Sequence, residues 1–553
     1  MMIGIISFIS FTSLVAIISY FATRKTDESS SDGYFLGGRS LTAGVIAGSL
    51  LLTNLSTEQL VGLNGSAYSE GILVMAWETL AAIAMVVTAL YLLPRYLKSG
   101  LTTIPQFLSN RFDITTKTLT SALFLTGYVV VLLPTILYSG SLAISGMFNV
   151  PELLGVSGKV ALWICIWGIG VIGSIYAVLG GLKAVAVSDS INAIGLLIGG
   201  ILIPIFGLMI IGDGSVFDGI TELQTKVPEK FNSIGDKTAS VPFRTIFTGM
   251  MLVQMFYWGT NQQIIQRALG AKNLQEGQKG LLLASFIKIL GPLIVVLPGI
   301  IAYYMSQKGM LSVSAPDQAY GELVKTVLPP ELIGFFAAVL FGAILSSFNS
   351  VLNSSVTLFG IDIYKEHINK DADEKTTVKY GKLFGIILAI GAMLIAPFLS
   401  DLDSIFSYLQ QVNGIYSIPI LTIIFVGYAT KKVPAIAAKI GLLSGSILYI
   451  ISEFFIRPNR VNNALAEAEA NGIISPEALK VVEVDAYPHF LHIMAILFLL
   501  NVIIMLIIGY FKPRPIEYKQ KFTDEVDITP WKHAKVVGII IVIIVISVYL
   551  YYS

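Results

Sequence analysis

The sequence predicts an all-α integral membrane protein with about fourteen transmembrane helices. Hydrophobic residues make up 55% of the 553 residues, charged residues make up only 13%, and the mean hydropathy is +0.77. Soluble domains carry about twice that proportion of charge. A spanning helix needs about 20 consecutive apolar residues, and the chain contains many such stretches. Because hydrocarbon cannot satisfy free backbone groups, we expect each stretch to be helical.

The fourteen predicted spans are read in order from the apolar stretches. They lie at about 3–22, 42–62, 71–96, 118–146, 160–180, 188–211, 245–268, 279–304, 332–363, 380–399, 403–428, 434–455, 486–510 and 534–552. The hydrophilic segments between them are too short for a separate globular domain. One of them, 456–485, is expected to hold a short surface helix. Function is therefore expected to reside in the membrane bundle.

The distribution of lysine and arginine predicts the orientation of the chain. With the N-terminus outside, the loops on the inner side carry 25 of the 36 basic residues and the outer loops carry ten, while Lys288 lies inside a predicted span. Both termini are therefore expected to lie outside. The compact loops suit a plasma membrane, in particular a bacterial inner membrane.

Charge and cysteine content argue against other classes of protein. The net charge of +1 provides no basic patch for nucleic acid. The single cysteine, Cys165, cannot form an intramolecular disulfide, and four histidines without a Cys/His cluster do not suggest a metal centre of that type. The expected surroundings are the lipid bilayer and small solutes.

Two predicted spans are interrupted by polar residues. Residues 53–59 (TNLSTEQ) interrupt the second span, and residues 259–263 (GTNQQ) interrupt the seventh. Non-helical chain at membrane depth occurs only where it is buried in protein or lines a wet cavity. Breaks at corresponding places in two halves of a chain are typical of the solute and ion site of a secondary transporter.

Two ionisable side chains lie inside predicted spans. They are Glu78 in the third span and Lys288 in the eighth. An ionisable residue at this depth is a candidate for a functional site, usually with a partner or a wet cavity. The alternative interpretation is an ion pair between helices, or a lysine that snorkels to the interface.

The ninth predicted span carries a polar face. Ser346, Ser350, Asn353 and Thr357 are spaced by four, three and four residues, so they share one side of a helix. Such oxygen atoms can bind a hard cation, or the small residues can simply allow close packing. The carbonyls freed by an opposing broken helix favour the cation.

Six stretches resemble the sodium/solute symporter family, and specifically its sodium/sugar branch. They are residues 33–41 (GYFLGGRSL), 54–59 (NLSTEQ), 175–185 (IYAVLGGLKAV), 257–267 (YWGTNQQIIQR), 297–300 (LPGI) and 346–354 (SSFNSVLNS). The resemblance follows the family's order and implies a leucine-transporter-like core of two inverted five-helix repeats. These repeats would occupy 42–211 and 245–428. A first helix and cytoplasmic loop (1–41), an extracellular loop (212–244) and three further helices (429–553) complete the implied organisation.

The resemblance also implies that the transported cation is sodium. Its ligands would be the carbonyls of Leu52, Leu55 and Ala343 and the hydroxyls of Ser346 and Ser347. Asp189 matches an acidic residue on the family's cation exit path, although by itself it would be interpreted as a helix N-cap. Asn349 stands where members with a second sodium tend to have a hydroxyl, so the resemblance leaves the stoichiometry open.

For the solute, the resemblance implies a site for a sugar. The side chains expected to form this site are Gln59, Glu78, Gln254, Tyr257, Trp258, Gln262, Lys288 and Gln410. These types suit a polyol, because carboxylates and amides bond to hydroxyls and an aromatic face packs on C–H groups. Leu132, Ala81 and Gln254 depart from the branch, where asparagine, serine and asparagine are usual, so the identity of the sugar is open.

We therefore expect a secondary active symporter and not an enzyme. Inward sodium flow would be coupled to uptake of a neutral hexose or inositol by alternating access between two states. One alternative is sodium-coupled symport of an amino acid, carboxylate or vitamin. Another is a sodium-dependent sensor or a leak channel on the same scaffold. Tyr257 and Trp258 resemble a gate, which argues against a continuous pore.

Overall fold

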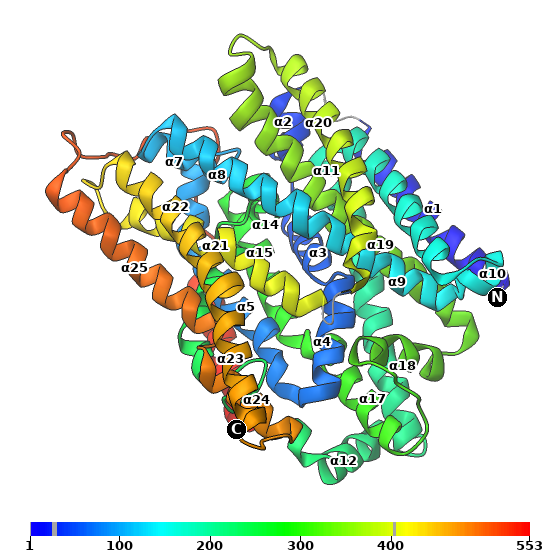
Figure 1. The fold of residues 1–553 in the computed structure, drawn as a ribbon. Coiled ribbons are helices and arrows are strands. Elements are labelled where there is room, and N and C mark those ends of the chain that lie inside the picture. Colours follow the sequence, from blue (N-terminus) through cyan, green and yellow to red (C-terminus); the bar gives the residue numbers. More distant parts are fainter. Residues whose placement is uncertain (1, 25–29, 402–404) are drawn as a thin grey trace.

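The computed structural model describes residues 2–24, 30–401 and 405–553, and it is built of helices (Figure 1). Within these ranges no strand forms, and the backbones of Leu41 and Ala271 make an isolated parallel bridge. The predicted all-α class is therefore confirmed.

The described residues up to the first long loop form eleven α-helices. They are α1 (Met2–Thr23), α2 (Ser31–Leu36), α3 (Ala43–Asn54), α4 (Thr57–Glu70), α5 (Ala76–Val87), α6 (Leu93–Lys98), α7 (Ile104–Arg111), α8 (Ile114–Gly127), α9 (Leu133–Phe148), α10 (Val150–Leu154) and α11 (Gly158–Ile211). Single π-helical stretches, Thr88–Leu92 and Tyr128–Leu132, join α5 to α6 and α8 to α9.

The remaining helices follow the loop after α11. They are α12 (Val216–Lys226), α13 (Gly249–Gly259), α14 (Gln262–Leu269), α15 (Leu274–Leu290), α16 (Pro292–Val295), α17 (Leu297–Gln307), α18 (Ala319–Val327), α19 (Pro330–Thr357), α20 (Glu374–Ile395), α21 (Ile405–Ala429), α22 (Ala435–Ile450), α23 (Arg457–Ala470), α24 (Pro476–Ala486), α25 (Phe490–Phe511) and α26 (Ala534–Tyr551). A π-helical stretch, Leu358–Ile368, extends α19. The loop expected to hold one surface helix holds α23 and α24.

The number of unbroken spans differs from the predicted fourteen. Among the described residues, eleven helices are long and apolar enough to cross a bilayer, or twelve if the bent pair formed by α15 and α16–α17 counts as one span. The breaks explain much of the difference, because α3 has only 12 residues and α13 and α14 have 11 and 8. The number fourteen stays a prediction.

A glycine bends the longest helix. The sequence predicts two spans at 160–180 and 188–211, and the structure has two, Gly158–Val178 and Gly181–Ile211, which meet at a kink at Gly181 within the 54 residues of α11. The φ angle of Gly181 is +56°, and a Cβ there would lie 2.9 Å from the Tyr34 carbonyl oxygen. Only glycine tolerates both the angle and the contact.

The two broken helices lie in the middle of the bundle (Figure 1). The helix α3 packs against α11, α15 and α19, and α5 packs against α13 and α15. The C-terminal helices α21, α22 and α25 pack against one another at one side of the core. Because α3 packs against α15 and α5 packs against α13, segments about 200 residues apart in the sequence lie next to each other around the two breaks.

Candidate ion and solute site

The first break separates α3 from α4 at Leu55 and Ser56. Leu55 leaves the helical conformation with a ψ angle of 59°, while its N–H still bonds to the Leu51 carbonyl at 2.7 Å. Ser56 is extended and is the N-cap residue that precedes α4. The last carbonyls of a helix lack partners within it. The end of α3 therefore offers oxygen atoms deep inside the protein.

The second break separates α13 from α14 at Thr260 and Asn261. The N–H groups of both residues bond to the Phe256 carbonyl at 2.9 Å. The Asn261 side chain caps α14 by accepting a hydrogen bond from the Gln263 N–H, and it accepts another from the Tyr128 hydroxyl at 2.5 Å. A side chain from a different span thus holds the break in place.

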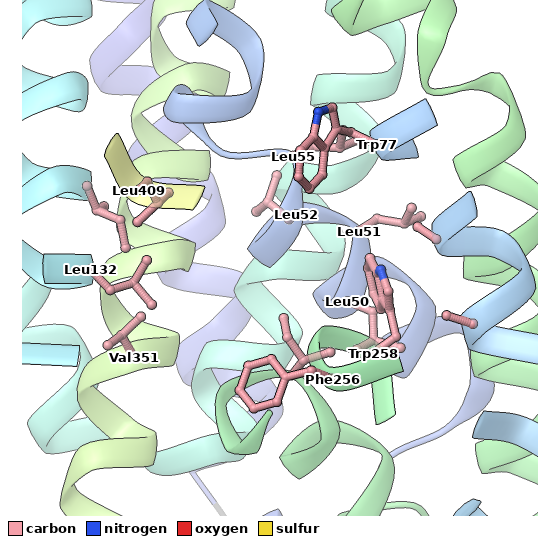
Figure 2. Close-up of a cluster of buried hydrophobic side chains, with 14 of the residues drawn as sticks. Leu50, Leu51, Leu52, Leu55, Trp77, Leu132, Phe256, Trp258, Val351 and Leu409 are labelled. Carbon is pink, nitrogen blue, oxygen red and sulfur yellow. The ribbon is translucent and has the colours of Figure 1, made fainter. Parts of the chain in front are cut away.

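A cavity lies between the two breaks. Its polar lining comprises Thr53, Asn54, Glu58, Gln59, Gln254, Asn261, Gln263, Ser347, Gln410, Asn413 and Ser417, and its aromatic lining comprises Trp77, Phe256, Tyr257, Trp258 and Tyr416. Figure 2 shows the apolar side chains Leu132, Val351 and Leu409 together on one side, away from Trp77 and Trp258. The cavity is therefore mostly amide-lined and aromatic.

Several of these polar atoms have no protein partner. In the part of the chain that the structure describes, Glu58 Oε2, Gln59 Oε1 and Ser417 Oγ are buried and make no hydrogen bond. A buried polar atom left unpaired costs about 1–3 kcal/mol. Carboxylate and amide oxygens only accept hydrogen bonds. The cavity therefore suits a solute that carries several O–H or N–H donors.

Five of the eight predicted solute residues line this cavity. They are Gln59, Gln254, Tyr257, Trp258 and Gln410. The Gln254 amide also donates to the Trp77 carbonyl at 2.9 Å, and the rings of Tyr257 and Trp258 meet edge to face with centroids 5.2 Å apart. The gate-like aromatic pair is thus in contact.

The predicted site residues leave out seven polar residues of the cavity wall, which are Thr53, Asn54, Glu58, Asn261, Gln263, Asn413 and Ser417. Asn54 and Glu58 belong to the interrupted stretch already singled out, so their place in the break was the available signal. Asn413 lies three residues after Gln410 on α21, and residues three apart share a helix face. That spacing could have identified it.

Glu78 and Lys288 do not line the cavity. The Lys288 ammonium bonds to Glu78 Oε2 and to Asn54 Oδ1, and both charged side chains are 1% exposed. The Trp258 ring centroid is 5.7 Å from Lys288 Nζ. Of the interpretations that the sequence left open, the structure supports the ion pair between helices. This pair lies directly behind the cavity wall.

Gln262 is also directed away from the cavity. Its amide oxygen accepts a hydrogen bond from the Ile104 N–H at 2.9 Å, and its amide nitrogen donates to the Thr102 carbonyl at 3.2 Å. Both ends of the side chain are therefore occupied by the backbone at the start of α7, one by the linker residue Thr102 and one by Ile104, the first residue of the helix. Gln262 ties the second break to that linker.

The predicted sodium ligands lie where α3 meets α19. The Ser347 hydroxyl donates to the Thr53 carbonyl at 3.1 Å, and Thr53 Oγ1 lies 3.0 Å from Ser350 Oγ and 3.5 Å from Ser346 Oγ. The five predicted residues, Leu52, Leu55, Ala343, Ser346 and Ser347, are at most 2% exposed. Hydroxyls and the end of a broken helix thus converge at one buried place.

The polar face of α19 divides into two parts. Toward its C-terminus, the Gln266 amide nitrogen donates to Thr357 Oγ1 at 2.9 Å and to Asn353 Oδ1 at 3.2 Å, and the Ser354 hydroxyl donates to the Gln266 oxygen at 2.8 Å. These residues pack against α14. The cation interpretation therefore concerns the other part, from Ser346 to Ser350.

Asp189 lies inside α11 and does not cap a helix. The Ser49 hydroxyl donates to its Oδ2 at 2.6 Å, and Arg267 Nη2 lies 4.0 Å away. Arg267 also donates to Ser49 Oγ at 3.1 Å and bonds to Ser350 Oγ. A buried polar network therefore connects the carboxylate to the hydroxyl face of α19.

A bundle built around two broken helices, with an amide-lined cavity beside a hydroxyl face, defines a membrane transporter. A model of the Sodium:solute symporter family matches residues 34–445. The chain belongs to this family, and it is a multi-pass membrane protein.

Two relatives and one solved structure illustrate the similarity. The chain is 45% identical to an uncharacterized symporter, YidK, of Escherichia coli (strain K12), over 99% of this chain and 90% of the relative. It is 33% identical to a sodium/glucose cotransporter of Vibrio parahaemolyticus, over 80% of this chain and 83% of the relative. It also matches the substrate-bound outward-open structure of a Na+-coupled sialic acid symporter, with a TM-score of 0.71 and 18% identity over 94% of this chain and 99% of that one. The predicted leucine-transporter-like fold is confirmed.

Proposed function

We propose that the chain is a sodium-coupled symporter that carries a small neutral sugar or polyol into the cell by alternating access. The observation that carries this proposal is the amide-lined cavity with unpartnered acceptors, beside the contact of α3 with the hydroxyls of α19. The relation to a sodium/glucose cotransporter supports a sugar. Both termini would lie outside a plasma membrane, and the inverted repeats would occupy 42–211 and 245–428.

The composition of the cavity wall favours a neutral solute. Among the described residues that line it, none is a lysine or arginine, and Glu58 is the ionisable acid. An anionic solute buried there would lack a cationic partner, which is costly in a low-dielectric site. Amides can both donate to and accept from hydroxyls, and the aromatic rings can pack on the C–H faces of a sugar.

Sodium would be bound between the end of α3 and α19. Its proposed ligands are the carbonyls of Leu52, Leu55 and Ala343 and the hydroxyls of Ser346 and Ser347. An ion held by both helices would favour the state in which they are close, and such differential affinity is the basis of coupling. One charge crossing ~100 mV contributes ~2.3 kcal/mol and a tenfold gradient adds ~1.4 kcal/mol, which together support roughly 500-fold accumulation.

A second candidate solute is a small amine such as an amino acid. The observation that favours it is the unpartnered Oε2 of Glu58 in the cavity wall. An ammonium group would satisfy that oxygen with a charge-assisted hydrogen bond. The two candidates differ in their dependence on the Glu58 charge.

Uptake into proteoliposomes tests the proposal. The probes are labelled galactose, glucose, myo-inositol, proline and sialic acid, with an inward sodium gradient and a matched potassium control. We expect sodium-dependent accumulation of a hexose or inositol that is lost in Gln59→Ala and kept in Lys237→Met, an exposed outer residue paired with Asp485. Accumulation of proline alone, abolished by Glu58→Gln, would favour the amine, and uptake without sodium dependence would refute the coupling.

A further inference from the structure

Residues 512–533 join α25 to α26 and run along the bundle without regular secondary structure. We call this segment the strap. The Arg514 N–H donates to the Lys432 carbonyl at 2.8 Å, and the Leu274 N–H donates to the Asp527 carbonyl at 2.9 Å. Lys432 lies between α21 and α22, and Leu274 begins α15. Backbone hydrogen bonds therefore fix the strap to two parts of the chain that are remote from each other in the sequence.

The strap also lies directly on the linker between α6 and α7, residues 99–103. The Gln520 amide nitrogen donates to Ser99 Oγ at 2.7 Å. At Gly100 the φ angle is +61°, and a Cβ there would lie 2.9 Å from Thr523 Oγ1. Glycine tolerates both this angle and this close approach. The linker therefore has a residue that allows the strap to approach its backbone.

The same linker and its two flanking helices hold the second break. The Gln262 side chain bonds to the Ile104 N–H at 2.9 Å and to the Thr102 carbonyl at 3.2 Å. The Tyr96 hydroxyl on α6 donates to the Gly259 carbonyl at 2.9 Å. The linker is thus bonded to the strap and to the second break at the same time. A large movement of the break would have to carry the linker along or lose these bonds.

Further anchors connect the strap to other helices of the core. The Trp531 N–H donates to Gln278 Oε1 on α15 at 2.8 Å, and the Gln278 amide nitrogen donates to the Ala89 carbonyl at 3.1 Å. The Arg514 guanidinium donates to the Arg111 carbonyl at the end of α7 at 2.6 Å. The anchors of the strap therefore lie in both of the proposed inverted repeats.

We propose that the strap is a latch of the transport cycle: while attached it holds the linker and the second break, and it leaves the linker when the solute site opens toward the side of the membrane on which the strap lies. This inference rests on the proposed function. Alternating access requires two arrangements of the broken helices. Contacts that exist in only one arrangement shift the balance between the two. The strap lies outside residues 34–445, so the latch is an addition to the core that the family model matches.

A reversible crosslink tests whether the strap leaves the linker. In a chain with Cys165→Ala, the substitutions Ser99→Cys and Gln520→Cys place one thiol on each side of the contact, and a short, reducible bis-methanethiosulfonate reagent joins them. We expect sodium-driven uptake of labelled galactose, glucose or myo-inositol to fall at least about 10-fold on crosslinking and to return with dithiothreitol. The two single-cysteine variants, treated in the same way, should keep their uptake. A strap that only supports the fold would stay attached throughout the cycle, so normal uptake by the crosslinked protein would overturn the latch.

Hydrogen exchange of the full chain in detergent gives a second readout that needs no solute. Gln520→Ala removes the side-chain bond to Ser99, and Lys519→Ala, an exposed neighbour on the strap, is the control. We expect amide exchange to rise at least about 5-fold both in the linker and in α14 in Gln520→Ala, and in neither segment in the control. If α14 stays unchanged while the linker loosens, the strap does not act on the break and the inference fails.

The two readouts separate this inference from the proposed function. If the parent protein transports none of the three sugars, the proposed function fails, and hydrogen exchange alone decides the inference. The same holds if the double-cysteine variant is inactive before crosslinking. If the parent transports a probe and the crosslinked protein transports it equally well, the proposed function stands and the latch is wrong.

Discussion

The ammonium of Lys230 donates a hydrogen bond to the Ser69 carbonyl at 2.6 Å and a second one to the Tyr68 carbonyl at 3.0 Å. These carbonyls belong to the last turn of α4, the second half of the first broken helix. A cation at a helix C-terminus is favourable both for the helix dipole and for carbonyls that lack partners. The loop that carries Lys230 therefore holds the C-terminal end of α4.

Replacement of this lysine should loosen the C-terminal end of α4. The Lys230 side chain is mostly buried and its ammonium lies 3.8 Å from the Tyr303 ring centroid, so burial lowers the pKa of Lys230. Lys230→Met should lower stability by about 1–3 kcal/mol, measured as melting temperature in detergent. Lys237→Met is the control, because Lys237 and Asp485 form an exposed pair that contributes little. Equal losses in both variants would contradict the fastening role.

Ser347→Ala should weaken sodium binding. The Ser347 hydroxyl lies at the contact between α19 and the end of α3, where it donates to the Thr53 carbonyl. Loss of one oxygen ligand should cost about 1–3 kcal/mol of binding free energy. This cost corresponds to about 5- to 150-fold weaker sodium binding. The measurement is the rise in melting temperature with sodium chloride, compared with potassium chloride.

Ser355→Ala is the matched control for this experiment. Ser355 is on the same helix, and its hydroxyl donates to the Val351 carbonyl within α19. It should leave the sodium dependence unchanged. An unchanged sodium response in Ser347→Ala would remove Ser347 from the cation site.

Gln266→Leu should affect stability and not sodium affinity. The Gln266 amide nitrogen donates to the Phe35 carbonyl at 2.8 Å as well as to Asn353 and Thr357, and the side chain is fully buried. Leucine would leave several buried polar groups unpaired at about 1–3 kcal/mol each. We expect a large fall in melting temperature with an unchanged sodium response. A weakened sodium response would extend the cation site toward Asn353.

Local sequence patterns predicted much of the fold and part of the site. The apolar stretches indicated helices, and the polar interruptions located the breaks at Leu55 and Thr260, because local composition determines both. The spacing of the hydroxyl residues on α19 identified the polar face. It did not show that one part of this face contacts Gln266 and the other part contacts the end of α3. That division depends on which helices meet, and this is determined by tertiary packing.

The same limit applies to Glu78 and Lys288. Their burial within spans was evident from the sequence, whereas their mutual contact joins residues 210 positions apart. Sequence alone could not decide between a contact with solute and a contact with each other. Gln262 is a similar example, since its two hydrogen bonds reach the backbone of a linker 158 to 160 residues away.

The close approach of α3 to α11 gives a final prediction, at Gly48. A Cβ at this position would lie 2.7 Å from the Ser190 Cα, and backbone cannot move aside as the end of a side chain can. The Ser190 hydroxyl donates to the Val45 carbonyl across the same contact at 3.1 Å. Small residues permit such proximity between membrane helices. Gly48→Ala should therefore separate the helices that carry Ser49 and Asp189.

Gly44 provides a control on the same helix, because a Cβ there meets nothing within 4 Å. Gly44→Ala should be neutral or raise stability by up to about 1 kcal/mol, since alanine is the better helix former. Gly48→Ala should cost about 1–3 kcal/mol from overpacking, measured as melting temperature in detergent. Because the strain falls next to the Ser49–Asp189 hydrogen bond, the sodium-induced rise in melting temperature should also shrink in Gly48→Ala and not in Gly44→Ala. Identical behaviour of the two variants would show that α3 can shift away from α11 without cost to the ion site.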